Sequence, residues 1–549
     1  MTEKMTAAKA LVKCLELENV STVFGYPGAA ICPFYDELTH SQTEHILVRH
    51  EANAGHAASG MARITGRAAV CCATSGPGAV NLITAIATAY MDSIPIVAIT
   101  GQVCTDQIGK DVFQEADITG AAEPFVKHSY LIKDAQSLPE TVKKAFHIAS
   151  TGRPGPVLLD IPFDVLLEEI RFSGAADYAK LPEIRGYKPN TAGNKLQIKR
   201  VIEAIQEAEK PLICAGGGLF NRYAFTLMRE IAERADIPVV NTMMGISSIP
   251  GEHPLSYGMI GMHGKPIANR AINECDLLIL LGARVNDRAV LALNQRELKV
   301  IHVDIDPAEI GKNLPATIPV VGDIYTVLEQ ITELLPEKKH TEWNKYLRDN
   351  AESPPVNPQY QPQISEKTIN PKNFIKILNR LMPDDTVIVS DVGQNQIWTA
   401  NNISLGESGR FMTTGGMGTM GYSVPAAIGV KKAEPLREVI AICGDGSFQM
   451  QMMELATAVQ HNINVKIIIM VNNRLGMVRE LQTNRYSDNL TAVFLDGSPD
   501  FIKLAAAYGI NGDYLTDEKN ADKALITLLA SKKPYVLQVS VDERAVSLI

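Results

Sequence analysis

Residues 438–473 read EVIAICGDGSFQMQMMELATAVQHNINVKIIIMVNN. Two apolar runs in this stretch, EVIAIC and VKIIIMV, each end in a polar cluster, GDGS after the first and NN after the second. Between the runs, residues recur at helical spacing and predict a helix with one buried face. They are Phe448, Met452, Leu455, Ala456 and Val459. The stretch predicts a strand, a helix and a parallel second strand, the repeating unit of a doubly wound α/β sheet.

The same alternation continues along the chain in three blocks. Apolar runs of the first block include AAVCCAT (68–74) and IPIVAIT (94–100). A connector at 166–195, which mixes charges with Gly, Pro and Asn, and the proline-rich segment ESPPVNPQYQPQ (352–363) separate the blocks. The fold class that we expect is α/β with three doubly wound parallel sheets and no sequence repeat among them, in domains at 1–165, 190–335 and 368–549.

The composition excludes several classes of partner. The 549 residues carry a formal net charge of -9, with no basic face for nucleic acid and no long run of one sign. The first twenty residues contain charges throughout, unlike a signal peptide, and no segment has the roughly 20 uncharged apolar residues that cross a bilayer. The eight cysteines include no CxxC pair. We therefore expect a cytoplasmic protein with reduced thiols and neither nucleic-acid nor membrane partners.

Polar side chains follow both strands of the opening stretch. Asp445 comes after the first strand and Asn472 after the second. Parallel neighbours lie about 4.8 Å apart, so two oxygen ligands at their ends can share one small hard cation. Gly444, Gly446 and Ser447 bring bare backbone amides to the start of the helix, which suits a phosphate. A magnesium-diphosphate site is one interpretation, and a tight turn with a helix cap is the other.

The interval of 27 residues from 445 to 472 resembles the signature of thiamine diphosphate enzymes, in which GDG precedes a buried strand ending in NN. The resemblance implies that Mg²⁺ is held by Asp445, Asn472 and the main-chain carbonyl of Arg474. This cofactor also needs a carboxyl group bonded to its aminopyrimidine ring, because that bond favours the imino form that removes the C2 proton. Glu51, after the run ILVRH, is a candidate, although a surface glutamate that caps the next helix is an alternative.

Longer motifs resemble one branch of these enzymes, the acetohydroxyacid (acetolactate) synthase large subunits. The motifs are RHEANAGHAASG, ATSGPGAVN, DSIPIVAITGQV and FQEADITG in the first block, HPLSYGMIGMHG, LLGARVNDR and HVDIDPAEIGKN in the second, and SDVGQNQIW and TTGGMGTMGYSVPAAIG in the third. The resemblance covers nearly the whole chain. It implies a first domain that binds the cofactor's pyrimidine, a Rossmann-like middle domain, and a third domain that binds the diphosphate and Mg²⁺.

The resemblance also assigns residues to the thiamine diphosphate site. It implies that Glu51 is the activating carboxylate, that Gln114 lines the reacting centre, and that Arg288 recognises the acceptor carboxylate by a bidentate pair. The residues that it places at this cofactor are Gly28, Glu51, Ser75, Pro77, Gly78, Asn81, Gln114, Gly393, Gln394, Asn395, Gly418, Met420, Gly444, Asp445, Gly446, Ser447, Asn472, Gly476 and Met477. In this family the first and third domains of one site come from different subunits, which implies a homodimer or homotetramer.

A second cofactor is implied for the middle block. The glycines at 216–218 follow a strand-like run. Glycines at such a place are found both in nucleotide-binding sites and in simple turns. The resemblance implies FAD, without a redox role in the main reaction. The residues at FAD-associated positions are Arg153, Gly217, Gly218, Met262, His263, Gly282, Arg284, Asn286, Arg288, Asp304 and Asp323. Asn286 replaces an Asp of the family pattern.

Three further departures fall near the implied substrate channel. Ala29 replaces the second Gly of YPGG, Phe163 replaces a Lys, and Leu481 replaces a Trp. In the family that Trp is tied to the preference for 2-ketobutyrate, and the loss of an aromatic contact is worth about 1 to 3 kcal/mol. We therefore expect weak selectivity between acceptors, or an altered acceptor.

The implied activity is decarboxylation of pyruvate and ligation of the hydroxyethyl unit to a second 2-keto acid. The product is 2-acetolactate or 2-aceto-2-hydroxybutyrate, for branched-chain amino-acid biosynthesis, and a small regulatory subunit is a possible partner. The alternatives are a related decarboxylase or carboligase with another acceptor, a flavin-redox oxidase, and a catalytically silent cofactor-binding subunit. Glu51 argues against the silent subunit, because binding alone does not need it.

Overall fold

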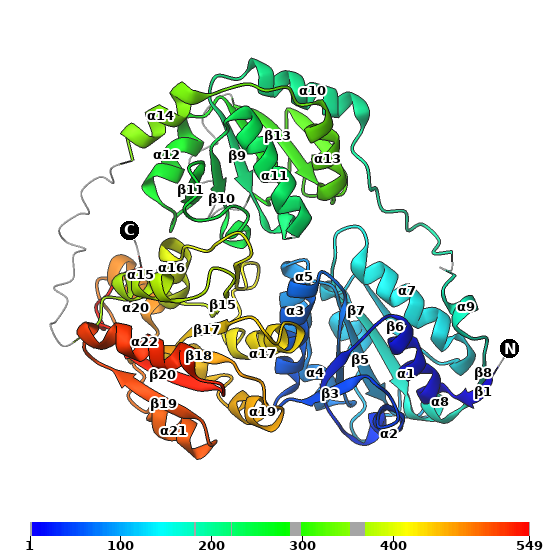
Figure 1. Ribbon diagram of the computed structural model, residues 1–549. Helices are drawn as coiled ribbons and strands as arrows, with labels where there is room; N and C mark the ends of the chain where they lie inside the picture. The colour runs from blue at the N-terminus through cyan, green and yellow to red at the C-terminus, as the bar shows by residue number, and fades with distance from the viewer. Residues whose placement is uncertain (1–2, 181–182, 221, 286–297, 352–367, 548–549) are drawn as a thin grey trace.

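The computed structural model describes residues 3–180, 183–220, 222–285, 298–351 and 368–547. It contains three six-stranded parallel sheets, one in each third of the chain, with helices on their faces. The three units lie at the corners of a triangle (Figure 1). A two-stranded antiparallel sheet also pairs β1 (Glu3–Thr6) with β8 (Glu169–Phe172). The parallel sheets confirm the predicted fold class.

The first and third sheets share one topology. The strand orders are β3-β2-β4-β5-β7-β6 and β16-β15-β17-β18-β20-β19, which are both 2-1-3-4-6-5 when strands are numbered within each sheet. The strands of the first are β2 Thr22–Tyr26, β3 Glu44–Leu47, β4 Ala69–Ala73, β5 Ile96–Gln102, β6 His128–Leu131 and β7 Val157–Pro162. Those of the third are β15 Val387–Ser390, β16 Arg410–Met412, β17 Val439–Gly444, β18 Lys466–Val471, β19 Asn511–Leu515 and β20 Tyr535–Ser540. Two units without recognisable sequence repetition therefore have the same winding.

The middle sheet is wound differently. Its order, β11-β10-β9-β12-β13-β14, is 3-2-1-4-5-6 in the same numbering, the order of dinucleotide-binding folds. Its strands are β9 Pro211–Ala215, β10 Val239–Asn241, β11 Ser256–Met259, β12 Leu277–Leu281, β13 Lys299–Asp304 and β14 Ile318–Val321. In open α/β sheets, ligands bind where the winding reverses, which is between β2 and β4, between β9 and β12, and between β15 and β17. The topology thus predicts three ligand-binding sites, one at each reversal of the winding.

Helices cover both faces of each sheet. In the first unit they are α1 Ala7–Leu17, α2 Cys32–Leu38, α3 Glu51–Thr65, α4 Pro77–Asn81, α5 Ile83–Met91, α6 Ile118–Ala122, α7 Leu138–Ser150 and α8 Phe163–Leu167. The connector and middle unit contain α9 Ala175–Tyr178, α10 Lys195–Glu207, α11 Arg222–Ala235, α12 Pro266–Glu274, α13 Ile324–Leu334 and α14 Thr341–Asp349. The third unit contains α15 Pro371–Leu381, α16 Gln394–Asn402, α17 Ser423–Ala433, α18 Asp445–Gln449, α19 Glu454–Gln460, α20 Gly476–Arg485, α21 Phe501–Ala507 and α22 Ala521–Ala530.

The predicted helix between the two strands of the opening stretch is wrong in detail. The structure has two short helices there, α18 and α19, because residues 450–453 form turns. The predicted apolar face also fails at its end: Val459 is 39% exposed, whereas Glu454 is fully buried. Hydrophobic spacing missed this because Glu454 is buried to make hydrogen bonds with the first unit.

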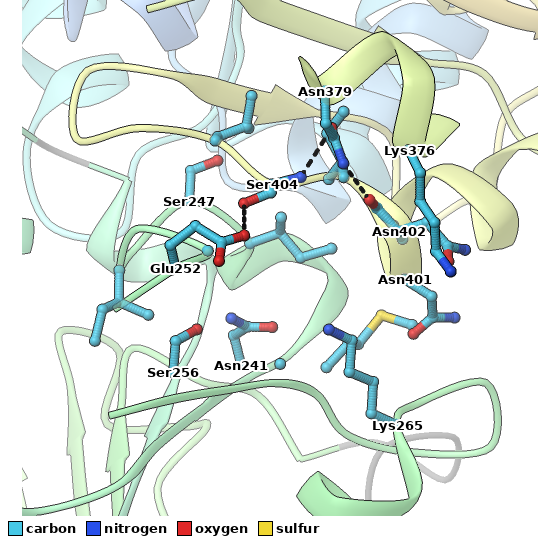
Figure 2. A pocket seen from close by; sticks show the side chains of 18 residues that line it. Asn241, Ser247, Glu252, Ser256, Lys265, Lys376, Asn379, Asn401, Asn402 and Ser404 are labelled. Atoms are coloured by element: carbon cyan, nitrogen blue, oxygen red, sulfur yellow. Dashed lines mark hydrogen bonds between the residues drawn. The ribbon is translucent and has the colours of Figure 1, made fainter. Parts of the chain in front are cut away.

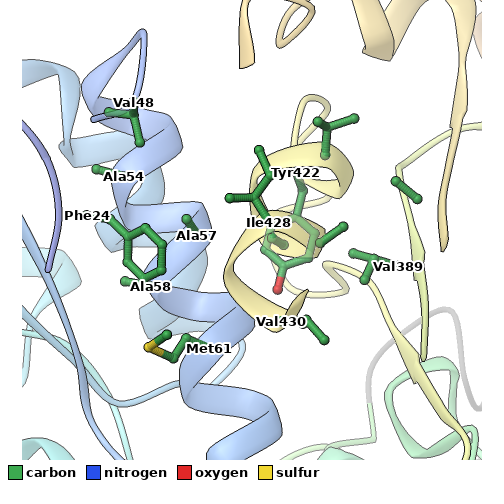
Figure 3. Close-up of a cluster of buried hydrophobic side chains, with 14 of the residues drawn as sticks. Phe24, Val48, Ala54, Ala57, Ala58, Met61, Val389, Tyr422, Ile428 and Val430 are labelled. Carbon is green, nitrogen blue, oxygen red and sulfur yellow. The ribbon is translucent and has the colours of Figure 1, made fainter. Parts of the chain in front are cut away.

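The third unit contacts both others. It meets the middle unit around a cavity of about 380 Å³ (Figure 2). It meets the first unit through α3 and α17, whose apolar side chains pack in one core that spans both sheets (Figure 3). The two helices touch at glycines: a Cβ atom on Gly60 would lie 2.1 Å from the Ala426 carbonyl oxygen, and one on Gly429 would lie 1.9 Å from that of Ala57. The first and third units are thus held at backbone contact.

None of the described helices is long and apolar enough to cross a membrane. None of the eight cysteines, all of which the structure describes, forms a disulfide, and six of them are buried. Cys104 is half-buried and Cys32 is exposed.

Substitution of Gly429 tests the importance of the α3–α17 contact. Gly429→Ala places a methyl group within 1.9 Å of a carbonyl oxygen, so the helices must separate and the free energy of unfolding should fall by about 1–3 kcal/mol. The midpoint of thermal denaturation measures this loss. Gly497→Ala is the control, because a Cβ atom there meets nothing within 4 Å. Equal midpoints for the two variants would contradict the prediction.

Candidate active site

The two polar clusters of the opening stretch meet at the carboxyl edge of the third sheet. β17 and β18 are hydrogen-bonded neighbours in parallel register, and Asp445 and Asn472 directly follow them. The buried Asp445 carboxylate accepts main-chain N–H bonds from Asn472 (3.2 Å), Asn473 (2.6 Å) and Gly446 (2.9 Å). Burial raises the pKa of Asp445 to about 6, against the lowering effect of these N–H donors. The carboxyl group is therefore mostly ionised at neutral pH.

The Asn472 side chain is fixed at both of its atoms. Its Nδ2 donates to Gln394 Oε1 (2.9 Å), and its Oδ1 accepts the Arg474 N–H (3.1 Å). Gln394 is itself held, since its Nε2 donates to Glu480 Oε1 (2.5 Å) and to the Ala545 carbonyl (2.8 Å). The Gln394 side chain thus orients Asn472. A Cβ atom on Gly476 would overlap Gln394 Oε1 at 1.8 Å, which explains a glycine at the start of α20.

The oxygen donors of this cluster fit a magnesium diphosphate. Asp445, Asn472 and the Arg474 carbonyl are hard oxygen ligands, and three of them make half of the octahedral shell that Mg²⁺ prefers. The described residues contain no group of three or more His, Cys, Asp or Glu side chains that could hold a metal. A cation here would take its remaining ligands from phosphate oxygens and water, which is how Mg²⁺ usually binds.

A turn that carries Met420 lies beside this cluster. A Cβ atom on Gly446 would be 3.6 Å from Met420 Cε, and the turn needs left-handed backbone at Gly418 (φ +64°) and Gly421 (φ +91°). The fully buried Asp391 holds the turn, because its carboxylate accepts N–H bonds from Gly421 (3.0 Å) and Ser423 (2.8 Å). Burial raises the pKa of Asp391. Asp391 is not among the site residues predicted from the sequence, although its position directly after β15 is one where ligand-binding residues are expected.

The remaining implied residues of the third unit lie around the same edge. Gly393, with φ +140°, is the N-cap of α16, which starts with Gln394 and Asn395. Ser447 is buried, and its Oγ accepts the Gly444 N–H (3.2 Å). Met477 is the second residue of α20. These residues come from the ends of β15, β17 and β18, so they occupy the reversal point of the sheet.

Glu51 belongs to a separate cluster in the first unit. It is the first residue of α3 and lies four residues after Leu47, where β3 ends. Its Oε2 accepts a hydrogen bond from Asn81 Nδ2 (3.0 Å), and its Oε1 faces Gly78, where a Cβ atom would lie 3.3 Å away. Gly78 is therefore required to leave the carboxyl group accessible.

Loops at the reversal point of the first sheet complete this cluster. Gly28 follows β2, and a Cβ atom on it would lie 2.5 Å from the Thr74 side chain. The buried Ser75 follows β4, and Pro77 begins α4. Gly76 packs on Gln114, which has a left-handed φ of +59°. We call the cluster of Gly28, Glu51, Ser75, Gly78, Asn81 and Gln114 the Glu51 half-site, and that of Gln394, Asn395, Met420, Asp445 and Asn472 the Asp445 half-site.

The third unit anchors the start of α3 in the same chain. Glu454 Oε1 accepts hydrogen bonds from the Arg49 N–H (2.9 Å) and from Asn53 Nδ2 (2.8 Å), on either side of Glu51. Burial raises the pKa of Glu454. The Glu51 half-site is thus positioned by a residue of α19, more than 400 positions away in the sequence.

The two half-sites approach each other only in part within one chain. A cavity of about 370 Å³ brings Asn53, His56 and Asn81 of the first unit opposite Met420 and Met450 of the third. Glu51 does not line this cavity, and no hydrogen bond between described residues joins the Glu51 half-site to the Asp445 half-site.

A buried network supports the loop that contains Gln114. Asp160 of β7 accepts hydrogen bonds from Thr100 Oγ1 (2.7 Å) and from Gln102 Nε2 (2.9 Å), and the same Nε2 donates to the Ala116 carbonyl (2.8 Å). Burial raises the pKa of Asp160 to about 7. The sequence analysis missed this network, because an aspartate inside a strand gives no signal of its partners.

The residues implied for FAD gather at the carboxyl edge of the middle sheet. Gly217 and Gly218 follow β9, Met262 and His263 follow β11, Gly282 and Arg284 follow β12, Asp304 ends β13, and Asp323 is the N-cap of α13. Two of the loops pack tightly, since the Gly218 N–H donates to the Gly282 carbonyl (2.9 Å) and a Cβ atom on Gly282 would lie 2.7 Å from Gly218 Cα. Burial raises the pKa of Asp304 to about 6. Their arrangement at the reversal point fits a dinucleotide. Asn286 and Arg288 lie outside the described residues.

Arg153 reaches from the first unit to this edge. Its guanidinium group forms ion pairs with Asp306 (3.2 Å) and Glu309 (3.3 Å), and its Nε donates to Ser93 Oγ (2.8 Å). Arg153 therefore joins the first and middle units.

The three residues that depart from the family pattern lie at accessible positions. Ala29 is exposed after Gly28, Phe163 is half-buried at the start of α8, and Leu481 on α20 is 45% exposed. Glu480, beside Leu481, points inward and accepts a hydrogen bond from Ser547 Oγ (2.6 Å) as well as that from Gln394. The outer face of α20 can therefore vary while its inner face supports Asn472.

Comparisons with known proteins agree with this geometry. Models of the thiamine pyrophosphate enzymes match the chain in three places: their N-terminal TPP binding domain at residues 5–121, their central domain at 198–331, and their C-terminal TPP binding domain at 391–539. A probable acetolactate synthase large subunit of Methanocaldococcus jannaschii is 44% identical over 546 residues, covering 98% of this chain and 92% of the relative. The acetolactate synthase of Arthrospira platensis is 43% identical over 560 residues, covering 98% and 94%.

Substitution of Asp160 tests the buried network. In the unfolded chain a carboxyl group ionises near its ordinary pKa of 3.8, whereas Asp160 in the fold keeps its proton to about pH 7. Its contribution to the free energy of unfolding should therefore decrease as the pH rises from about 4 to 7. Asp160→Asn stays neutral, and it can accept from Gln102 Nε2 through Oδ1 while its Nδ2 donates to Thr100 Oγ1, so the variant should gain stability relative to the unmodified protein over that range.

Thermal denaturation midpoints at pH 5, 6, 7 and 8 measure this difference. Asp496→Asn, at an exposed position, is the control and should follow the unmodified protein at every pH. A constant difference between Asp160→Asn and the unmodified protein would show that Asp160 does not titrate in this range.

Proposed function

This chain belongs to the acetolactate synthase large subunits of the thiamine pyrophosphate (diphosphate) enzyme family, and from that premise we propose how its residues perform the reaction. The reaction decarboxylates pyruvate and joins the two-carbon unit to a second 2-keto acid, giving 2-acetolactate when that acid is also pyruvate. The observation that carries the proposal is the meeting of Asp445 with Asn472 across the ends of β17 and β18, beside a glycine-rich turn.

The Asp445 half-site holds the cofactor's diphosphate. Asp445, Asn472 Oδ1 and the Arg474 carbonyl would hold Mg²⁺, whose charge would offset that of the phosphate oxygens. Gln394 and Glu480 keep the Asn472 oxygen in place, and Asp391 keeps the turn that presents Met420. When bound, thiamine diphosphate supplies the electron sink for decarboxylation.

The Glu51 half-site activates the cofactor. Asn81 occupies only the Oε2 atom of Glu51, so Oε1, which faces Gly78, would be the atom that bonds the aminopyrimidine ring. The carboxyl group would there support the proton transfer that activates the cofactor. Gln114, with its backbone fixed by Gly76 and by the Asp160 network, faces the reacting centre.

The middle unit holds FAD as a structural group. The loops after β9 and β12 would hold its pyrophosphate, and Asp304 at the end of β13 and Asp323 at the start of α13 lie at the same edge. Arg153 contacts the same region from the first unit. Arg288, outside the described residues, binds the acceptor carboxylate in this proposal.

Each complete site is shared between two chains. The absence of hydrogen bonds between the two half-sites of the described chain supports this arrangement, and so does the exposure of apolar side chains beside each of them. Phe113, next to Gln114, is 86% exposed, and Met450, next to the Asp445 half-site, is 56% exposed. A partner chain would cover such surfaces.

Mixing two inactive variants tests the shared site. Glu51→Gln removes the activating carboxylate and Asp445→Asn removes a magnesium ligand, so each variant alone should lose at least about a hundredfold in acetolactate formation from pyruvate. If the half-sites come from different chains, co-assembled mixtures should recover about a quarter of the unmodified activity, because half of the dimers then contain one intact site of two.

The control is Glu123→Gln, which changes an exposed glutamate and should leave activity unchanged. Circular dichroism verifies that each variant is folded. Failure of the mixture to recover activity would place both half-sites in the same chain, and near-normal activity of Glu51→Gln alone would remove Glu51 from its role.

The acceptor is selected weakly, because Leu481 offers little aromatic surface to a longer keto acid. Leu481→Trp should raise the yield of 2-aceto-2-hydroxybutyrate relative to 2-acetolactate by about tenfold when pyruvate and 2-ketobutyrate compete. Its turnover with pyruvate alone should change little, because Glu480 and not Leu481 supports Gln394. Leu436→Trp, at a position that is 99% exposed, is the control. An unchanged product ratio in Leu481→Trp would show that this position does not contact the acceptor.

A further inference from the structure

The cavity between the middle and third units belongs to neither implied cofactor site. Its volume is about 380 Å³, and its walls come from β10, β11 and the segment between them on one side and from α15 and α16 on the other. Figure 2 shows side chains of both units pointing toward its interior. The volume is in the range of small-molecule sites.

Two buried carboxamide oxygens line this cavity without a hydrogen-bond partner. They are Oδ1 of Asn241 and Oδ1 of Asn401, whose residues are only 6% and 7% exposed. The orientation of Asn401 is fixed, because its Nδ2 donates to the His263 carbonyl (2.7 Å) and to the Ile397 carbonyl (3.2 Å). Buried acceptors of this kind are normally satisfied, so both oxygens call for a donor supplied from the cavity.

Two lysines supply positive charge to the same space. Lys265 and Lys376 line the cavity, and Figure 2 shows the Lys265 side chain directed into it. The structure records no hydrogen bond or ion pair from either ammonium group to another described residue. One carboxylate, Glu252, also lines the cavity, and it accepts a hydrogen bond from Ser404 Oγ (2.9 Å). The lining therefore has one more positive than negative charge.

The remaining polar residues of the lining, which stand among six apolar ones, are suited to hydroxyl groups. They are Ser247, Ser256, Asn379 and Asn402. Ser247 Oγ accepts the Phe411 N–H (2.7 Å), which leaves its own proton available to donate. Hydroxyls and carboxamides that both donate and accept match the alternating donors and acceptors of a polyol.

We propose that this cavity binds a small phosphorylated polyol, with the phosphate on Lys265 and Lys376 and hydroxyl groups donating to Asn241 and Asn401. The ammonium groups match phosphate oxygens by charge-assisted hydrogen bonds. The hydroxyl groups donate to the two unpartnered oxygens, whereas a metal cation would be repelled by the two ammonium groups.

Such a ligand would contact the helix that leads to the Asp445 half-site. α16 begins with Gln394, which orients Asn472, and its last turn contains Asn401, about 10 Å away along the axis. A ligand that holds Asn401 between two units restrains α16 as a whole. This coupling, unlike the binding itself, rests on the proposed function of Gln394.

Calorimetric titration of the protein loaded with thiamine diphosphate, Mg²⁺ and FAD tests the proposal. Glucose 6-phosphate and ribose 5-phosphate are the probes, with inorganic phosphate and sorbitol for comparison, and no keto acid is present. At least one sugar phosphate should bind saturably at one site per chain, more tightly than phosphate or sorbitol. Lys265→Met and Lys376→Met should each weaken this binding at least tenfold and leave acetolactate formation without the ligand unchanged.

The matched control is Lys523→Met, which removes an exposed lysine of α22 and should bind the sugar phosphate normally. Saturable binding that both cavity variants leave unchanged would overturn the site, as would the absence of binding by either sugar phosphate. Equally tight binding of inorganic phosphate would overturn the assignment of a polyol. Because no turnover is measured in the titration, failure of the proposed reaction would not produce any of these results.

Discussion

The structure depends on one buried carboxylate at the end of a strand. Asp445 is 1% exposed and is held by three main-chain N–H groups, two of which belong to the segment after the neighbouring strand. Burying a charge is costly unless donors surround it, so these strands must end side by side. The parallel β17–β18 pair achieves this, and the glycine-rich turn with Met420, which precedes α17, lies beside it. Gln394 and Glu480 support Asn472 in a similar way. The side-chain amide of Asn472 donates to Gln394, and the side-chain amide of Gln394 donates to Glu480, so the two residues fix the orientation of Asn472.

A second constraint is the backbone contact between α3 and α17. Gly60 and Gly429 let each helix approach the carbonyl oxygens of the other, and a common apolar core covers both sheets (Figure 3). The contact brings α19 to the start of α3, where Glu454 binds the residues on both sides of Glu51. The helix that begins with Glu51 is therefore positioned by the unit that contains the Asp445 half-site, even though Glu51 itself turns away toward Gly78 and Asn81.

The two outer units have the same winding but carry different chemistry. In both, the loops after the first and third strands meet where the winding reverses. In the third unit these loops present Gly393 and Asp445, and in the first they present Gly28 and Ser75, so one edge suits a cation with its phosphates and the other a heterocyclic ring. The two half-sites therefore differ in polarity, which agrees with the proposed binding of one cofactor across a pair of units.

The sequence by itself determined the class of fold and the places of the two polar clusters, because strand and helix periods are local and the GDG and NN clusters directly follow apolar runs. It predicted that Asp445 and Asn472 end adjacent strands, since parallel strands end at one edge. It did not reveal the break between α18 and α19, the burial of Glu454, or the roles of Asp391 and Asp160. Each of those depends on a partner distant in the chain, such as Arg49 for Glu454 or Gln102 for Asp160. Only the tertiary structure decided these contacts, because a buried polar group is defined by the donors that folding brings to it.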